Sequence, residues 1–147
     1  MKRSGFKRKA TVPMKRTSIK RKSKSSTRKL QDELWQECRR IAIEKYKQKD
    51  GTWKCFTCGK PIDGSNKQLG HFIPNSVGGA LLRYNLDNLR LQCYYCNINL
   101  GGNGSTFYKN LLEENGQEYI NKLFQLKGQT TKAEDHYKKL LTEYKSL

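Results

Sequence analysis

Apolar residues recur every three or four positions along residues 27–49. The residues with this spacing form one stripe: Leu30, Leu34, Trp35, Cys38, Ile41, Ala42 and Tyr46. A period near 3.6 residues is typical of an amphipathic helix. Thr27 is a candidate N-cap for it, because a hydroxyl can accept a bond from a free backbone N–H. Cys38 lies on the stripe, so we interpret it as a small buried hydrophobic side chain.

The middle of the chain has short apolar runs separated by turn residues. After a turn at Asp50-Gly51, residues 52–62 predict a short strand that runs into a knuckle, and residues 67–74 predict another short strand. Residues 75–88 contain Gly-Gly and several Asn, and predict mostly loop. The run "LRLQ" then leads into a second knuckle.

The last third of the chain returns to helical spacing. Ser105 can cap a helix that Gly116 interrupts and that resumes up to Gly128. Thr131 and Glu134 have the spacing of a capping box, which predicts a final helix. The fold class is therefore α+β: a helix, a small ββ unit, then two or three helices.

Positive charge is concentrated at the start of the chain. Lys and Arg outnumber Asp and Glu by 30 to 13, for a net charge of +17, and residues 1–29 hold 13 of the basic residues and no acidic one. Such a segment cannot bury enough apolar surface to offset its ordering entropy. We therefore expect residues 1–26 to form a disordered basic tail and residues 27–147 to form one domain.

A polyanion is the natural partner for this tail, and nucleic acid is the first candidate because phosphate contacts release counterions. The tail has no amphipathic apolar face and the chain has no 18-residue apolar run, so we expect no membrane association. These features favour a cytoplasmic protein, in which the five Cys would not form a disulfide framework.

Four of the five Cys form two CxxC pairs. Cys55 and Cys58 make the first pair, and Cys93 and Cys96 follow 34 residues later. Two such knuckles can present four thiolates to one Zn²⁺, and a closed sphere of four Cys is typical of a structural site. Zinc coordination is worth about 10–16 kcal/mol in small modules, which can hold a core of short, Gly-rich strands. Four unligated thiols or a redox CxxC are the alternatives.

His71 is one of only two His in the chain. It can be a core residue, a zinc ligand or a catalytic base. With four Cys filling the zinc sphere, it is not needed there. It ends a predicted strand, and Asn97 follows the last Cys on what we expect to be a short helix packed across that strand. A His beside an oxygen ligand is the minimum for metal-assisted phosphodiester hydrolysis.

The segments "GHFIP" and "NLDNLRLQCYYCN" resemble the HNH, or His-Me finger, nuclease signature. More narrowly, residues 55 to about 147 resemble the lambdoid phage NinG/Rap family of recombination endonucleases through "CFTCG", "GHF", "LRYNLDNLRLQCYYCN", "GGN" and "GQEYINKL". The resemblance implies a zinc-stapled, HNH-like ββα-metal core and an endonuclease that cuts branched DNA, such as Holliday junctions and D-loops, in the host cytoplasm.

Carried over residue by residue, the resemblance makes His71 the general base. Asn88 would orient that His or tie down the loop. Asn97 would hold a catalytic Mg²⁺ or Mn²⁺. Asn85 and Asn103 also match Asn positions of the family, and we interpret them as loop residues that satisfy backbone groups.

Two positions depart from the general HNH pattern. Gly70 stands where an acidic ligand often precedes the base, and Gly101 stands four residues after Asn97. The metal would then have one clear protein ligand, with water and phosphate as the others, which Mg²⁺ tolerates. Asp87 is a weaker candidate ligand. We expect His136 to be a solvated surface residue.

Three classes of function remain open. Besides the endonuclease, the chain can be a zinc-ribbon DNA-binding module, in which Tyr94 and Tyr95 stack on bases. It can also be an accessory recombination protein. An apolar strip exposed on the last helix, with Leu140, Leu141 and Tyr144, would favour that accessory role, although the strip can equally pack on the first helix. Resolving a junction needs two opposed cuts, which favours a homodimer.

Overall fold

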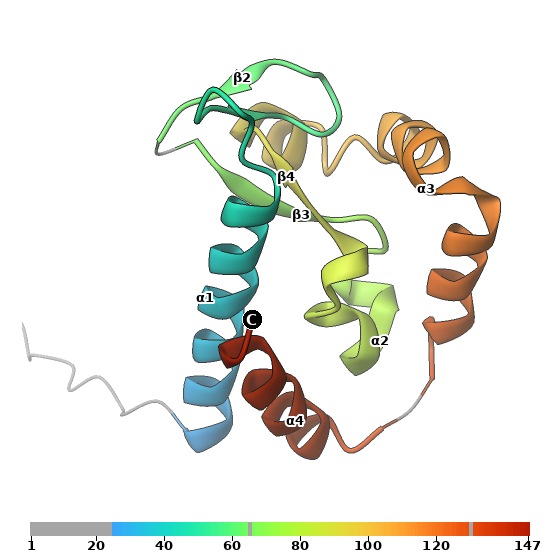
Figure 1. Cartoon of the computed structure of the whole chain (residues 1–147). Coiled ribbons are helices and arrows are strands. Elements are labelled where there is room, and N and C mark those ends of the chain that lie inside the picture. The colour runs from blue at the N-terminus through green and yellow to red at the C-terminus, as the bar shows by residue number, and fades with distance from the viewer. Residues whose placement is uncertain (1–24, 65, 130) are drawn as a thin grey trace, which may run out of the picture.

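The computed structural model describes residues 25–64, 66–129 and 131–147 (Figure 1). Most of the predicted basic tail lies outside the described residues, and its boundary at residue 26 stays a prediction. The described elements are α1 (Ser26–Lys45), β1 (Trp53–Lys54), β2 (Pro61–Ile62), β3 (Gln68–His71), α2 (Asn75–Arg83), η1 (Leu86–Asn88), β4 (Leu89–Gln92), η2 (Tyr95–Asn99), α3 (Gly104–Leu126) and α4 (Ala133–Lys145). This is the mixed α+β arrangement that the sequence predicts.

Two antiparallel hairpins form the β structure. β1 pairs with β2 around the first knuckle, and β3 pairs with β4, with His71 opposite Leu89. Figure 1 shows the β3–β4 hairpin at the centre of the fold, with α1 along one side. Leu69 and Leu91, from the two strands, share one buried core cluster with Leu34 of α1. The hairpin is therefore fixed by packing against α1 as well as by its own hydrogen bonds.

The helix α1 follows the predicted stripe. Cys38 is fully buried, as expected, and burial raises the pKa of its thiol to about 12. The prediction of Thr27 as N-cap is wrong. Ser25 is the N-cap, and its hydroxyl accepts a hydrogen bond from the N–H of Arg28. The helix thus begins two residues earlier than expected, because the chain offers a second hydroxyl residue upstream.

The helix α4 packs on α1, so its apolar strip faces the core and does not form an exposed surface. The Tyr144 hydroxyl donates to the carbonyl of Tyr84 (2.9 Å), and Arg40 of α1 donates to the carbonyl of Tyr144 (2.8 Å). Leu140 and Leu141 pack against the same core cluster. The prediction of a capping box is wrong. Lys132 is the N-cap of α4, and no side chain makes a hydrogen bond to the backbone at this cap. Thr131 therefore lies one position too early to cap the helix.

Residues 75–83 form α2, so the prediction of a mostly loop segment from 75 to 88 is wrong. The two adjacent glycines suggested loop, and Gly79 does interrupt the helix with a φ of 70°. Leu82 nevertheless lies in a second buried cluster, with Ile73 of the preceding loop and Phe107 of α3. Burial of this leucine face outweighs the local preference of the glycines.

The helix α3 covers this second cluster. Its kink at Gly116, where φ is 80°, is the interruption that the sequence predicts. The prediction that Ser105 caps the helix is wrong, because α3 already begins at Gly104. Asn103 precedes it in a left-handed conformation, with no side-chain hydrogen bond at the cap. The left-handed Asn103 turns the chain sharply enough that Ser105 falls inside the first turn.

Candidate functional site

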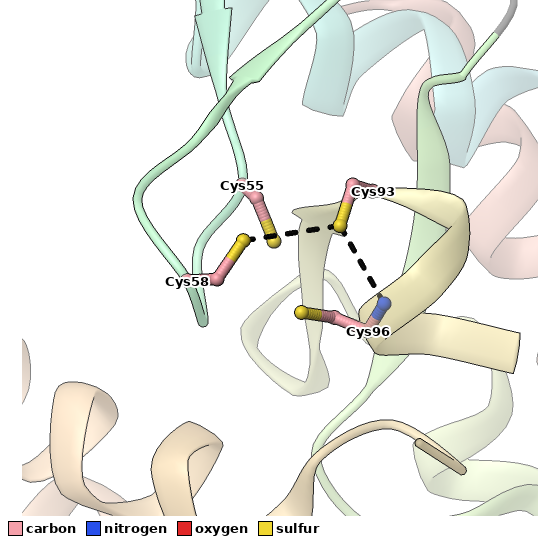
Figure 2. Close-up of side chains that lie close together, drawn as sticks. All are labelled: Cys55, Cys58, Cys93 and Cys96. Atoms are coloured by element: carbon pink, nitrogen blue, oxygen red, sulfur yellow. Dashed lines mark hydrogen bonds between the residues drawn. The ribbon is translucent and has the colours of Figure 1, made fainter. Parts of the chain in front are cut away.

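The two CxxC pairs meet in space. Their four sulfur atoms lie within 4.8 Å of one another, and they could hold a metal ion such as a structural zinc. Figure 2 shows Cys55 and Cys58 on the β1–β2 loop facing Cys93 and Cys96 on the other side. The Sγ atoms of Cys58 and Cys93 are 3.9 Å apart. Four sulfur donors at this spacing suit tetrahedral zinc and leave no open coordination position.

Hydrogen bonds shape both the first knuckle and the reactivity of its thiols. The N–H of Gly59 donates to the carbonyl of Cys55 (2.9 Å), which closes the turn. Burial alone would raise the pKa of the Cys55 thiol, but backbone and Thr57 hydrogen bonds lower it to about 6. Burial and neighbouring thiols raise the pKa of Cys58 to about 12. Adjacent thiolates repel one another, which is the reason such a cluster favours a bound cation.

His71 ends β3, and its ring is held on two sides. The Nε2 atom lies 2.9 Å from the backbone carbonyl oxygen of Arg83 at the end of α2. A carbonyl can only accept, so Nε2 carries the proton and Nδ1 keeps its lone pair. The ring stacks on Trp35 of α1, with centroids 5.6 Å apart and planes 5° from parallel.

This environment keeps the His71 ring neutral near pH 7. Burial is the main cause of a pKa below the usual 6.5. The hydrogen bond to the carbonyl of Arg83 opposes that shift, while the positive charge of Arg83 adds to it. A neutral imidazole with a free Nδ1 is the form that accepts a proton.

Asn88 is fully buried and fixes the chain around His71. Its Oδ1 accepts from the N–H of Ile73 (2.7 Å), and its Nδ2 donates to the carbonyls of Ile73 (3.0 Å) and Leu82 (3.1 Å). These bonds join the end of β3 to α2, next to the Arg83 carbonyl that holds the imidazole. Of the two roles that the resemblance allows, the contacts match tying down the loop.

Asn97 lies on η2, the short helix expected after the last Cys, and η2 packs on β3 beside Gly70. The Oδ1 of Asn97 would be 3.1 Å from a Cβ placed on Gly70. The Oε1 of Gln92 would be only 1.8 Å from the same Cβ. Position 70 therefore has no room for a side chain, and this explains why the acidic residue of the HNH pattern is replaced by glycine.

The Gln92 carboxamide that fills this space was not singled out from the sequence. It is fully buried, and its Nε2 donates to the carbonyl of Gly102 (2.8 Å) and to the hydroxyl of Thr57 (3.2 Å). These bonds join β4 to the first knuckle and to the turn that follows η2. The signal that could have revealed it is a polar residue in an otherwise apolar strand directly before a CxxC pair.

His71 and Asn97 line the same cavity, which has a volume of about 320 Å³. Residues on one face of α1 also line it. Its lining residues are Arg28, Gln31, Asp32, Trp35, Leu69, His71, Asn75, Arg83, Tyr84 and Asn97. Arg28, Asp32 and Trp35 have the spacing of one helical face. Their place in the site was not predicted, because it depends on contacts between residues far apart in the sequence.

The sequence was compared with models of known protein families. A family model described as Bacteriophage Lambda NinG protein matches residues 1–147, the full chain. The chain belongs to the NinG family. A search of curated proteins and a search of solved structures found no match. The family resemblance seen in the sequence motifs is thus confirmed.

The remaining Asn and Gly predictions for this NinG-family chain fall outside the cavity. The side chain of Asn85 accepts from the N–H of Asp87 (2.8 Å) and caps η1, which is a backbone-satisfying role. Asn103 forms the left-handed turn before α3. Gly101 also has a positive φ, of 57°, a conformation that favours glycine over a ligating side chain.

Asp87 and His136 line a separate cavity, away from His71. The structure therefore does not bring Asp87 to Asn97. His136 is half-buried and its buried Nε2 has no hydrogen-bond partner among the described residues, so the expected surface residue is only partly solvated. Its ring is tilted by 49° against that of Tyr137, with the two centroids 6.1 Å apart. In the part of this NinG-family chain that the structure describes, no helix has the length and apolar character to cross a membrane.

Proposed function

We propose that this NinG-family protein is a divalent-metal-dependent DNA endonuclease with an HNH-like ββα-metal core. The observation that carries the proposal is the arrangement of His71. Its tautomer is fixed by the Arg83 carbonyl, its ring is kept neutral by burial, and it shares a cavity with Asn97. The β3–β4 hairpin and η2 supply the two strands and the helix of such a core.

His71 acts as the general base in this proposal. The oxygen of a water molecule forms a bond to phosphorus, and Nδ1 accepts the proton of that water. The phosphorus–oxygen bond to the sugar breaks, and the sugar oxygen leaves with the bonding electron pair and takes up a proton from solvent water. Trp35 and Arg83 hold the ring so that Nδ1 keeps one direction. Asn88 is a positioning residue, since its hydrogen bond to the carbonyl of Leu82 fixes the end of α2, which carries the Arg83 carbonyl.

The cavity wall carries oxygen donors suited to a hard divalent cation. Asn97 and Asn75 offer amide oxygens, and oxygen donors are the ligands of Mg²⁺ and Mn²⁺. The Asp32 carboxylate also lines the cavity but is paired with Arg28 (3.5 Å). Asn97 would hold the cation, as the family resemblance implies. When bound, the cation supplies charge stabilisation at the phosphate.

Positive charge around the cavity supports a nucleic-acid substrate. Arg83 lines it together with Arg28, which is paired with Asp32 (3.5 Å). Besides Arg28, residues 1–29 add 12 basic residues. We propose branched DNA as the substrate on the strength of the family resemblance, with the host bacterial cytoplasm as the location. A homodimer would allow two opposed cuts at a junction.

The second candidate is a DNA-binding module without catalysis. The exposure of Tyr94 and Tyr95, at 52% and 61%, favours it, because exposed aromatic side chains can stack on bases. The same protein could bind DNA in this way and also cut it. The two functions differ in whether His71 matters for anything beyond structure.

Single-turnover cleavage of a labelled Holliday junction and of linear duplex tests the proposal. We expect His71→Ala to lose roughly 10²-fold or more of the cleavage rate, in line with general-base contributions, and to keep DNA binding and zinc. We expect Asn97→Ala to lose cleavage but to regain part of it at higher Mg²⁺ or Mn²⁺, because metal occupancy follows mass action.

His136→Ala is the matched control, since it removes the other His, which lies outside the cavity. It should cleave at the wild-type rate. Cleavage by His71→Ala at the wild-type rate, or no cleavage by the wild type with either metal, would instead favour the DNA-binding module.

A further inference from the structure

We propose that the exposed apolar side chains of Tyr94, Tyr95, Ile98 and Leu100, called here the η2 strip, stack on unpaired nucleobases next to the phosphate that is cut. The proposal rests on the proposed function and adds the part of the substrate that this surface contacts. It predicts that open DNA is preferred to a fully paired duplex because of this strip.

The strip is a concentration of exposed apolar surface. The exposed fractions of the four side chains are 52%, 61%, 53% and 46% in the order given. They make up half of the eight large hydrophobic side chains that are exposed in the described chain, and they fall within seven consecutive residues. Single exposed hydrophobics are ordinary, but a contiguous group marks an interaction site.

Holding the fold together does not require these four side chains. The inward face of the same segment carries Cys96, which is buried in the metal cluster, and Asn97, which meets the cavity. The start of the segment is fixed by its backbone, because the N–H of Tyr94 donates to Oδ1 of Asn66 (2.7 Å). The aromatic and aliphatic groups thus point away from the interactions that stabilise η2.

Positive charge near the strip comes from Lys67 and from Arg83, which lines the neighbouring cavity. Other basic residues nearby are paired with acidic ones: Arg28 with Asp32, Arg90 with Glu114 and Lys109 with Glu113. The proposed function therefore gives the strip its partner, which is DNA. A partner protein with an acidic surface would also meet this charge, but the apolar strip lies beside the candidate catalytic residue Asn97, where the substrate itself must bind.

The chemistry of the strip selects one part of the DNA. A Tyr hydroxyl can donate a hydrogen bond to a phosphate, but the apolar faces of Tyr and Ile side chains contact the flat faces of bases instead. In a paired duplex those faces are covered by neighbouring base pairs, and they become accessible where strands separate. Asn97 lies within about one helical turn of each residue in the strip, so the bases that it meets are those next to the cut.

Binding to DNA without added divalent metal tests this separately from cleavage. The probes are a fully paired duplex and the same duplex with a central unpaired bubble, followed by fluorescence anisotropy. We expect the wild type to prefer the bubble. We expect Tyr94→Ala/Tyr95→Ala to lose about fivefold or more for the bubble, the least that stacking on one base contributes, and less than about twofold for the duplex.

Two variants control for other causes. Tyr94→Phe/Tyr95→Phe keeps the rings and should keep the bubble preference. Leu147→Ser removes an exposed apolar side chain elsewhere (69% exposed) and should bind like the wild type. A 2-aminopurine base in the bubble should be quenched when wild-type protein binds, and this readout does not depend on whether a variant folds.

Equal losses for bubble and duplex, or no quenching of 2-aminopurine, would overturn the proposal. A wild-type dimer that Tyr95→Ala converts to monomer in sedimentation would also overturn it, because the strip would then be a contact between two copies. If the wild type cuts DNA but gives any of these three results, the proposal about the η2 strip is refuted and the proposed function is not. If the wild type binds no DNA, the proposed function is refuted as well.

Discussion

Gly70→Ala is a small change that the structure predicts to be costly. The added Cβ would lie 1.8 Å from Oε1 of Gln92 and 2.7 Å from its Cδ. Both distances are far below a van der Waals contact, so the buried carboxamide must move. Movement breaks its hydrogen bonds to Gly102 and Thr57, and it disturbs Asn97, whose Oδ1 would be 3.1 Å from the new atom.

The magnitude follows from these contacts. Each lost hydrogen bond costs about 1 kcal/mol, and overpacking a buried site costs about 1–3 kcal/mol. Two lost hydrogen bonds and the overpacking together should lower the free energy of unfolding by roughly 3–5 kcal/mol. For a domain of this size, that corresponds to a melting temperature about 10 °C lower.

A double-mutant cycle with zinc present isolates the clash. Gln92→Ala alone should destabilise the protein, because it leaves a cavity and removes both hydrogen bonds. In that background Gly70→Ala should cost little, since the added methyl enters the space that the carboxamide has left. Thermal unfolding of the four proteins gives the coupling energy. If Gly70→Ala costs less than about 0.5 kcal/mol and shows no coupling to Gln92→Ala, the account of Gly70 is refuted.

Three further predictions follow from the metal cluster, from the His71 ring and from the basic tail. Cys93→Ser should give a poorly folded protein without zinc, and wild-type zinc content by atomic absorption together with a wild-type melting temperature would contradict the structural site. Because burial lowers the pKa of His71, the cleavage rate should rise with pH through a midpoint below 6.5 and then level off. In a Trp53→Phe background, the fluorescence of Trp35 should change with pH at the same midpoint. If this change is still present in His71→Ala, another group causes it. Deleting residues 1–24, which lie outside the described residues, should weaken binding to all DNA shapes alike and reduce the salt dependence; an unchanged salt slope with a lost junction preference would make the tail a recognition element.

Local patterns were enough to predict the metal cluster and the strand end at His71. Two CxxC pairs have one simple way to share a metal, and the structure brings their sulfur atoms together as the spacing implies. The stripe that contains Cys38 also predicts a helix without knowledge of its partner. These features depend on residues close in sequence, where periodicity and ligand spacing are informative.

The rest of the site depends on contacts between distant residues. Trp35 is 36 positions from His71 in sequence, and nothing in its helical stripe indicates that its ring stacks on an imidazole. Gln92 was likewise part of an expected strand, without any sign of the space at Gly70 that it fills. The helix α2 was missed because its glycines favour loop, while the burial of Leu82 that stabilises it is a tertiary effect.

The packing of α4 on α1 has a consequence for the order in which the cavity is completed. During synthesis the four Cys, His71 and Asn97 all emerge before residue 133, where α4 begins. The wall that carries Trp35 belongs to α1, and α1 is held in part by Arg40 and the carbonyl of Tyr144. A nascent chain can therefore gather its metal cluster before the cavity beside His71 has its final shape. Helix α4 is made after these residues, and its contact with Arg40 helps to hold α1, and with it Trp35, against the imidazole of His71.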